Sequence, residues 1–190
     1  MRRLLIALPA LALLAGCGLL YAELEIPSTT ITLKQQAFPA TLPGVPLVKD
    51  LTFDVGSQLP YIDNKDVTYE LRLTQMQVKL DTGSAMGDFG GIKSVTLSVL
   101  PPPGQTLPEA TIIASYSKAP PPADQNPTSI AVSGMSNLDL APYIASGTMT
   151  LRLQALPETL GAPIPAWTAD VGGEFYLMVH ADYGKLLTKK

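Results

Sequence analysis

The feature that most constrains the fold is an alternation of apolar and polar residues with a period of two, which recurs along most of the chain. Beyond residue 20, no long stretch has the 3.6-residue period of a helix. Such alternation is typical of strands that turn one face toward a core. The apolar members of the clearest segments are Leu51, Phe53 and Val55; Val67, Tyr69, Leu71 and Leu73; Val95, Leu97 and Val99; Ile112, Ala114 and Tyr116; Ile130 and Val132; Met149, Leu151 and Leu153; and Phe175, Leu177, Val179, Ala181 and Tyr183.

One of these segments changes phase in its middle. The apolar residues are odd-numbered up to Leu73 and even-numbered from Met76 through Val78 to Leu80. A shift of one residue moves every later side chain to the opposite face of a sheet. The sequence therefore predicts either a β-bulge near Thr74-Gln75 or a strand that bends there from one sheet to another. Because residues 67–80 would be unusually long for one straight strand, we expect two segments separated by a kink.

Proline and glycine punctuate the strands. The 18 prolines and 15 glycines are many for a helical protein. Residues 81–91 and 118–127 are predicted to be loops, and Pro101-Pro102-Pro103-Gly104 ends the strand before it because proline cannot donate to a ladder. Residues 137–146 could hold a short helical turn, which Pro142 limits.

Eight or nine short strands separated by turns predict an all-β fold, an antiparallel β-sandwich of Ig-like architecture with at most one or two short helical turns. A barrel is the alternative. The cysteine–tryptophan–cysteine pattern of true Ig domains is absent, so only the architecture is predicted. We expect a single domain over residues 22–184, followed by a basic tail over residues 185–190.

The N-terminal segment has the order of an export signal. Arg2 and Arg3 precede an apolar run from Leu4 to Ala15, which contains Pro9. A membrane-spanning helix needs about 20 apolar residues. We therefore predict a signal peptide over residues 1–16 rather than a transmembrane helix.

The only cysteine of the chain follows this run directly. The stretch Leu14-Ala15-Gly16-Cys17 resembles a bacterial lipobox, with leucine at −3, small residues at −2 and −1, and cysteine at +1. The resemblance implies that the peptide is cut between Gly16 and Cys17 and that Cys17 is lipidated on its thiol and new amino group by acyl chains such as palmitate. Two or three chains anchor a protein firmly, whereas one chain binds reversibly.

The resemblance also implies a location. The residue after the cysteine is Gly18 rather than the aspartate that commonly retains such proteins in the inner membrane. We therefore expect a lipoprotein of the bacterial cell envelope, in the outer membrane rather than the inner membrane and with access to the periplasm. Residues 17–21 form a short tether, so the domain lies close to the bilayer. The body resembles uncharacterised lipoprotein β-domains in strand pattern alone.

Charge excludes one class of partner. Removal of residues 1–16 deletes two arginines, so Lys+Arg falls from 13 to 11 against 16 acids, and the net charge moves from −3 to −5. Nucleic-acid-binding proteins need basic patches, so no nucleic-acid partner is expected. The membrane, reached through the lipid on Cys17, is the predicted partner, together with a possible envelope protein.

The chain offers no catalytic set. His180 is the only histidine and is predicted to point away from Phe175, Leu177 and Val179. Asp81-Thr82-Gly83 matches the triplet of aspartic proteases, but such a site needs a second aspartate in a similar setting, and no second triplet exists. A hairpin loop is the expected role of residues 81–83, and no enzymatic activity is predicted.

Metal and cofactor sites are also not predicted. Asp63, Asp66, Asp81 and Asp88 carry the hard oxygen ligands that calcium prefers, but no calcium-binding loop pattern surrounds them. Solvated turn residues are the favoured interpretation of these four aspartates. One histidine and one lipidated cysteine leave no zinc set, and no glycine-rich phosphate loop precedes a helix.

Two functions follow from this reading. The first is a membrane-anchored lipoprotein whose β-sandwich is a non-enzymatic structural or protein-interaction domain. The alternative is an envelope module that binds a lipid, a glycan or a metal ion. The tyrosines and Trp167 could stack on sugars, although their placement on separate segments favours a role in the core and its rim.

Overall fold

The structure is a computed structural model that describes residues 21–57, 67–108, 111–135 and 137–182. It contains eight strands and one short 3-10 helix, η1 at Ala141–Tyr143. The strands are β1 (Tyr21–Phe38), β2 (Leu47–Asp54), β3 (Val67–Leu80), β4 (Ile92–Val99), β5 (Thr111–Ser117), β6 (Ser129–Gly134), β7 (Thr148–Pro157) and β8 (Trp167–Asp182). The predicted all-β class with little helix is confirmed.

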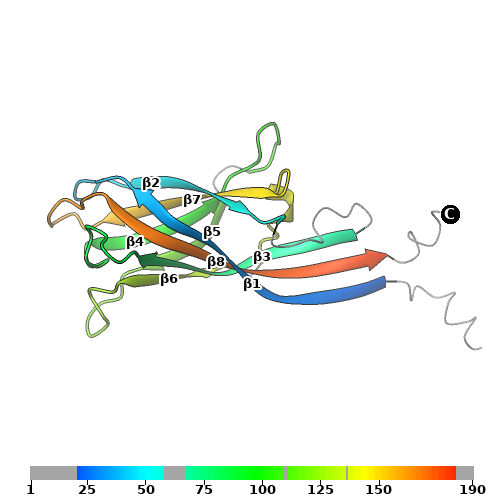
Figure 1. Ribbon diagram of the computed structural model, residues 1–190, viewed down its shortest axis with the longest axis horizontal. Coiled ribbons are helices and arrows are strands. Elements are labelled where there is room, and N and C mark those ends of the chain that lie inside the picture. Colours follow the sequence, from blue (N-terminus) through cyan, green and yellow to red (C-terminus); the bar gives the residue numbers. More distant parts are fainter. Residues whose placement is uncertain (1–20, 58–66, 109–110, 136, 183–190) are drawn as a thin grey trace, which may run out of the picture.

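All eight strands belong to one antiparallel sheet in the order β1-β8-β3-β6-β5-β4-β7-β2. The sheet curls so that its two halves enclose one core, and the edge strands β1 and β2 approach each other (Figure 1). The β1–β8–β3–β6 half faces the β5–β4–β7–β2 half, which is the two-layer packing expected of a sandwich.

Aromatic rings join the two halves and close one end of the core. Phe53 of β2 meets Phe175 of β8 edge to face, with ring centroids 5.9 Å apart. The rings of Trp167 and Phe38 are stacked, with centroids 3.9 Å apart, and the rings of Trp167 and Phe89 meet edge to face. All five rings are buried, so they contribute both burial and ring–ring contact to stability.

The predicted bulge lies in β3. Leu73 pairs with Phe175 and Gln75 pairs with Glu174, which leaves Thr74 as the extra residue. Leu73 and Met76 therefore both face the core, and β3 continues as one strand of 14 residues. Of the two explanations open from the sequence, the bulge is the one observed. The expected division of residues 67–80 into two segments was wrong, because the ladder with β8 continues on both sides of the bulge.

The prediction that Ile112 of β5 faces the core was wrong. Ile112 was expected to share the core face with Ala114, but 51% of its surface is exposed, whereas Ile113 is 1% exposed. The pairing with β4 jumps from Leu97–Ala114 to Ser98–Ile112, so Ile113 is the extra residue of a bulge. The bulge turns Ile113 inward and Ile112 outward.

Strands β1, β8 and β3 extend beyond the rest of the sheet (Figure 1). We call this extension the arm and define it as Tyr21–Glu25 of β1, Val67–Glu70 of β3 and Met178–Asp182 of β8. Its register pairs Tyr21 with Asp182 and Val67 with Ala181. The described part of β1 therefore begins, and that of β8 ends, at the tip of the arm.

Candidate functional site

Several predicted site residues lie outside the described residues. These are Gly16 and Cys17 of the lipobox, Asp63 and Asp66 of the four metal candidates, and the basic tail over residues 185–190. The predicted tether ends where β1 begins, at Tyr21, one residue earlier than the predicted domain start.

The two remaining metal candidates, Asp81 and Asp88, have different contacts. The carboxylate of Asp88 accepts a hydrogen bond from Gly90 N at 2.7 Å. The carboxyl group of Asp81 instead lies close to that of Asp170 on β8. Within the described part of the chain, no group of three side chains of the metal-binding types is placed to hold an ion.

The Asp81-Thr82-Gly83 triplet forms a turn, as predicted. Ser84 N donates to the carbonyl oxygen of Asp81 at 3.1 Å, and Gly83 has φ +92°. That positive φ suits the third position of a type II turn, where glycine is favoured because it has no Cβ. The triplet thus connects β3 to the loop that leads to β4.

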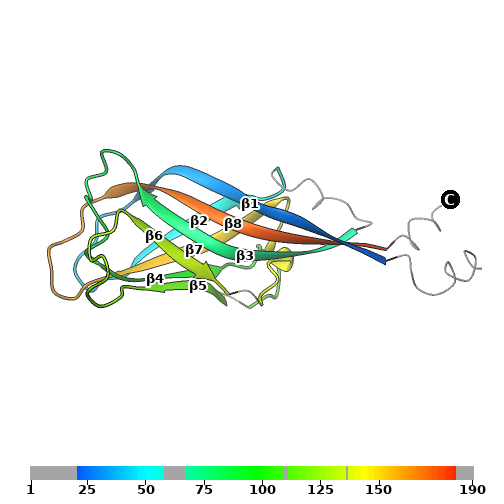
Figure 2. The same cartoon turned by 90° about the horizontal axis from the view of Figure 1, so that it is seen from below.

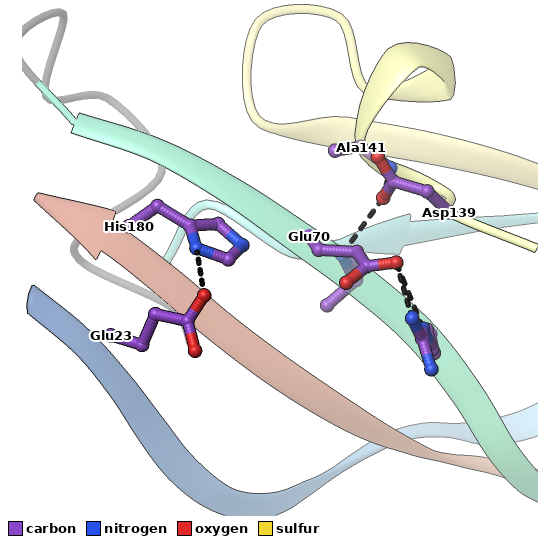
Figure 3. A network of polar contacts seen from close by, with 7 residues as sticks. Glu23, Glu70, Asp139, Ala141 and His180 are labelled. Carbon is purple, nitrogen blue, oxygen red and sulfur yellow. Dashed lines mark hydrogen bonds and ion pairs between the residues drawn. The ribbon is translucent and has the colours of Figure 1, made fainter. Parts of the chain in front are cut away.

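His180 lies on the outer face of the arm, as predicted. It is directly opposite Glu23 across the β1–β8 ladder, and its Nδ1 lies 3.4 Å from Glu23 Oε1 (Figure 3). On the same face, Glu70 pairs with Arg72 and thereby raises the pKa of the guanidinium. These contacts are one cross-strand polar contact and one same-strand ion pair on the outer face of the sheet.

The described aromatic side chains form no exposed row. Trp167 and Tyr143 are buried, and Tyr69, Tyr116 and Tyr176 are only partly exposed on three different strands. Partial burial raises the pKa of Tyr176, with a smaller contribution from the charge of Glu25. A stacking platform for sugar rings is therefore not assembled from these residues.

The sheet does carry a polar hollow of about 330 Å³ on its outer face, over β1, β8 and β3. Figure 2 shows these three strands side by side. We call this feature the hollow. Its lining residues are Thr30, Thr32 and Lys34 of β1; Asp170, Gly172 and Glu174 of β8; and Gln75, Gln77 and Lys79 of β3.

Strand register arranges the hollow as three rows. Thr30 and Gln75 flank Glu174, and Thr32 and Gln77 flank Gly172. In the third row, Lys79 of β3 is the register partner of Asp170 of β8. The ion pair in this row is between Lys34 Nζ and Asp170 Oδ2, which lie 2.6 Å apart. The only lining residue without a side chain is thus at the centre of a ring of polar side chains.

Backbone irregularities position this ring. The bulge at Thr74 sets Gln75 and Gln77 on the outer face. A second irregularity in β1, between Leu33 and Gln36, lets Gln35 adopt φ +51° and donate its N–H to Asp170 Oδ1 at 3.0 Å. The carboxylate of Asp170 accepts from Lys34 and from Gln35 N, and these hydrogen bonds hold its pKa below 3.8, its ordinary value.

Two consecutive glycines in β8 have different surroundings. A Cβ on Gly173 would lie 2.7 Å from Phe175 Cε2 in the core, so packing explains this glycine. A Cβ on Gly172 would meet only Thr32 Oγ1 at 3.5 Å and Thr30 Cγ2 at 3.8 Å, which are ordinary contacts. Packing therefore does not require glycine at residue 172, although glycine weakens a strand interior.

The hollow could not be predicted from the alternating pattern. The polar residues that line it become neighbours only through strand register, which joins segments about 90 to 145 residues apart. A glycine pair inside a strong strand pattern was the available signal, since an interior glycine often marks close approach of a ligand or another backbone.

A second surface lies at the end of the molecule opposite the arm. There the loop from β1 to β2 is joined to the loop from β7 to β8 by a Thr41–Ile164 bridge and by Gly44 N donating to Glu158 O at 3.1 Å (Figure 1). Leu42, Val45 and Leu160 are exposed on these loops, and Leu160 is 91% exposed. We call these three residues the loop-end leucine–valine cluster.

Comparison with known proteins assigns no family. No protein-family model and no curated protein matches the chain. The described residues contain no helix of the length and apolarity needed to cross a membrane. Solved structures with some likeness include tomato aspermy virus, at 12% identity and TM-score 0.28 over 89% of this chain and 93% of that one.

A second likeness is to the VP1 pentamer of Washington University polyomavirus, at 9% identity and TM-score 0.29 over 83% of this chain and 96% of that one. TM-scores this low carry no argument. What the geometry establishes is an antiparallel β fold, with a polar hollow on one face and apolar loops at one end.

Proposed function

We propose that this chain is a lipoprotein of the bacterial cell envelope, anchored by lipid on Cys17, whose β domain is a non-enzymatic structural or interaction module. The observation that carries the proposal is the position of the arm. Strand β1 starts four residues after Cys17, at the tip of an extension that projects from the rest of the sheet.

Four residues span at most about 14 Å, so the tip of the arm is held next to the bilayer. The arm then separates the rest of the domain from the membrane, and the loop-end leucine–valine cluster faces away from it.

The anchor is tested by fractionation of cells that express the chain. The wild-type protein is expected in the outer membrane, and Cys17→Ser is expected to abolish lipidation. Gly18→Ala, which keeps the lipobox, is the matched control and should fractionate as wild type. A Cys17→Ser protein that still fractionates like a lipidated protein would contradict the anchor.

The non-enzymatic part of the proposal has its own test. Purified protein is assayed against panels of esterase, glycosidase and peptidase substrates. We expect no turnover above the blank. Robust turnover that disappears in a single-residue variant would overturn this part while leaving the anchor intact.

The hollow favours a second candidate function, a ligand-binding envelope module. It is concave, and it is built from nine residues on three strands held in a fixed register. Such a site is compatible with the same anchor, because it lies on a face of the sheet and not at the tip of the arm.

A further inference from the structure

We infer that the hollow binds a neutral saccharide chain. One sugar ring lies over Gly172, and the surrounding side chains form hydrogen bonds with the hydroxyl groups of the sugar. The inference deepens the second candidate function by naming its site and ligand class. It does not depend on how the protein reaches the membrane.

The shape of the hollow points to a ligand that approaches the backbone. Gly172 is flanked by Thr32 and Gln77 and lies between Asp170 and Glu174 along β8. A Cβ at this residue would fit without strain, so packing does not explain the glycine. The missing Cβ makes the hollow deeper at this residue and leaves the backbone accessible to a ligand. A volume of 330 Å³ is at the lower end of the range for ligand sites, about 300–1,000 Å³.

The chemistry of the lining selects the ligand class. Thr30 and Thr32 both donate and accept, Gln75 and Gln77 present an amide donor and an amide acceptor each, and the carboxylates of Asp170 and Glu174 accept. A polyhydroxylated ligand also donates and accepts at each hydroxyl, so it can satisfy this mixed set. An apolar ligand would leave these groups unpaired, which costs binding free energy.

The charge of the lining argues for a neutral ligand. Among the lining residues, Lys34 and Lys79 are matched by Asp170 and Glu174, and Lys34 is already paired with Asp170 at 2.6 Å. The carboxyl group of Asp81, which lies close to that of Asp170, adds no positive charge. A phosphate or sulfate group placed over Gly172 would face the carboxylates on both sides along β8. A cation there would be disfavoured by the two lysines in the same way.

The position of the hollow favours a chain over a single sugar. It is open to solvent on a sheet face, and its lining residues form rows that run across three strands. An open polar site buries little apolar area, so we expect weak binding per ring and a gain when several rings lie along the face.

The test uses the full chain purified in detergent micelles. Short neutral oligomers of glucose and of N-acetylglucosamine are titrated and followed by saturation-transfer NMR. A sulfated oligomer of the same length is the charge comparison. We expect at least one neutral oligomer to bind with Kd below about 10 mM, its longer homologues to bind more tightly, and the sulfated form to bind more weakly.

Filling the hollow should remove binding and leave the fold intact. Gly172→Leu is expected to weaken binding by at least about tenfold with an unchanged far-UV spectrum. Thr52→Leu, on the exposed face of β2, is the matched control and should bind as wild type. If Gly172→Leu fails to fold, the double variant Gln75→Ala/Gln77→Ala replaces it, with the same expected loss.

Three outcomes would overturn the inference. These are no binding of any neutral oligomer by the wild type, unchanged binding by the folded variants that alter the hollow, and tighter binding of the sulfated oligomer than of the neutral one. None of them bears on Cys17, so a failure here is distinguishable from a failure of the anchor.

Discussion

At the residue scale, single side chains satisfy backbone groups that have no partner in the sheet. Asp139 is one of them: its Oδ1 accepts from Leu71 N and from Ala141 N, both at 2.9 Å (Figure 3). Leu140 N donates to Leu71 O on the same stretch of β3. Since β6 pairs with β3 only from Gln75 onward, these bonds satisfy backbone groups that the sheet leaves open.

Asp139→Ala should therefore destabilise the protein by about 1–3 kcal/mol, because two partly buried N–H groups lose their acceptor. The free energy of unfolding in urea measures this. Asp124→Ala removes a single bond to Asn126 N on an exposed loop and should cost less than about 0.5 kcal/mol. Equal losses for the two variants would contradict the role of Asp139.

The glycine pair in β8 should respond asymmetrically to alanine. Gly173→Ala places a methyl group 2.7 Å from the ring of Phe175 and should cost about 1–3 kcal/mol through overpacking. Gly172→Ala meets only ordinary contacts and should be neutral or stabilising by up to about 1 kcal/mol. Thermal unfolding of both variants checks this, and destabilisation by Gly172→Ala would show that the fold needs glycine there.

At the element scale, the sequence predicts a phase change only where apolar and polar residues are cleanly separated. In β3 the shift from odd to even apolar positions is unambiguous, and it predicts an irregularity near Thr74 without deciding between a bulge and a bend. In β5 the consecutive apolar residues Ile112, Ile113 and Ala114 fit either phase. Only the pairing with β4 decides which isoleucine is buried, and pairing is a tertiary property.

The two isoleucines of β5 allow a direct test of the corrected phase. Ile113→Ala should cost about 2–4 kcal/mol because it leaves a cavity in the core, whereas Ile112→Ala should change stability by less than about 1 kcal/mol. Urea unfolding with an unchanged m-value is the measurement. The reverse order of the two losses would restore the phase predicted from the sequence.

At the scale of the whole molecule, the sequence predicts the fold class but not the strand order. Placing β8 between β1 and β3 requires contacts between residues that are about 90 to 160 positions apart, which local patterns do not encode. The arm and the hollow both result from this order. They could not be predicted for the same reason, although the alternating segments at residues 67–80 and 175–183 were.

Charge pairs across distant strands should make stability depend on pH. The pKa of Asp50 is held below 3.8 by its hydrogen bonds to Arg152, and that of Asp170 by its bonds to Lys34 and Gln35 N. A lowered folded-state pKa means that the contribution is present above pH 3.8 and is lost as pH falls through the folded-state value. The urea midpoint should therefore decrease below about pH 4.

The Asp50–Arg152 pair is exposed, so its share of this decrease should be small, about 0.2–1 kcal/mol, and should shrink in high salt. In Asp50→Asn the loss between pH 5 and pH 3 should be smaller than in the wild type by that share. A wild-type midpoint that rises on acidification would contradict the direction assigned to both carboxylates.

The most direct test of the proposed function is intact and N-terminal-peptide mass spectrometry of the protein isolated from bacterial membranes. The account predicts a mature chain that begins at Cys17 and carries the mass of a diacylglyceryl group and an acyl chain on that residue. A mature chain that begins elsewhere, or a Cys17 with an unmodified thiol, would contradict it.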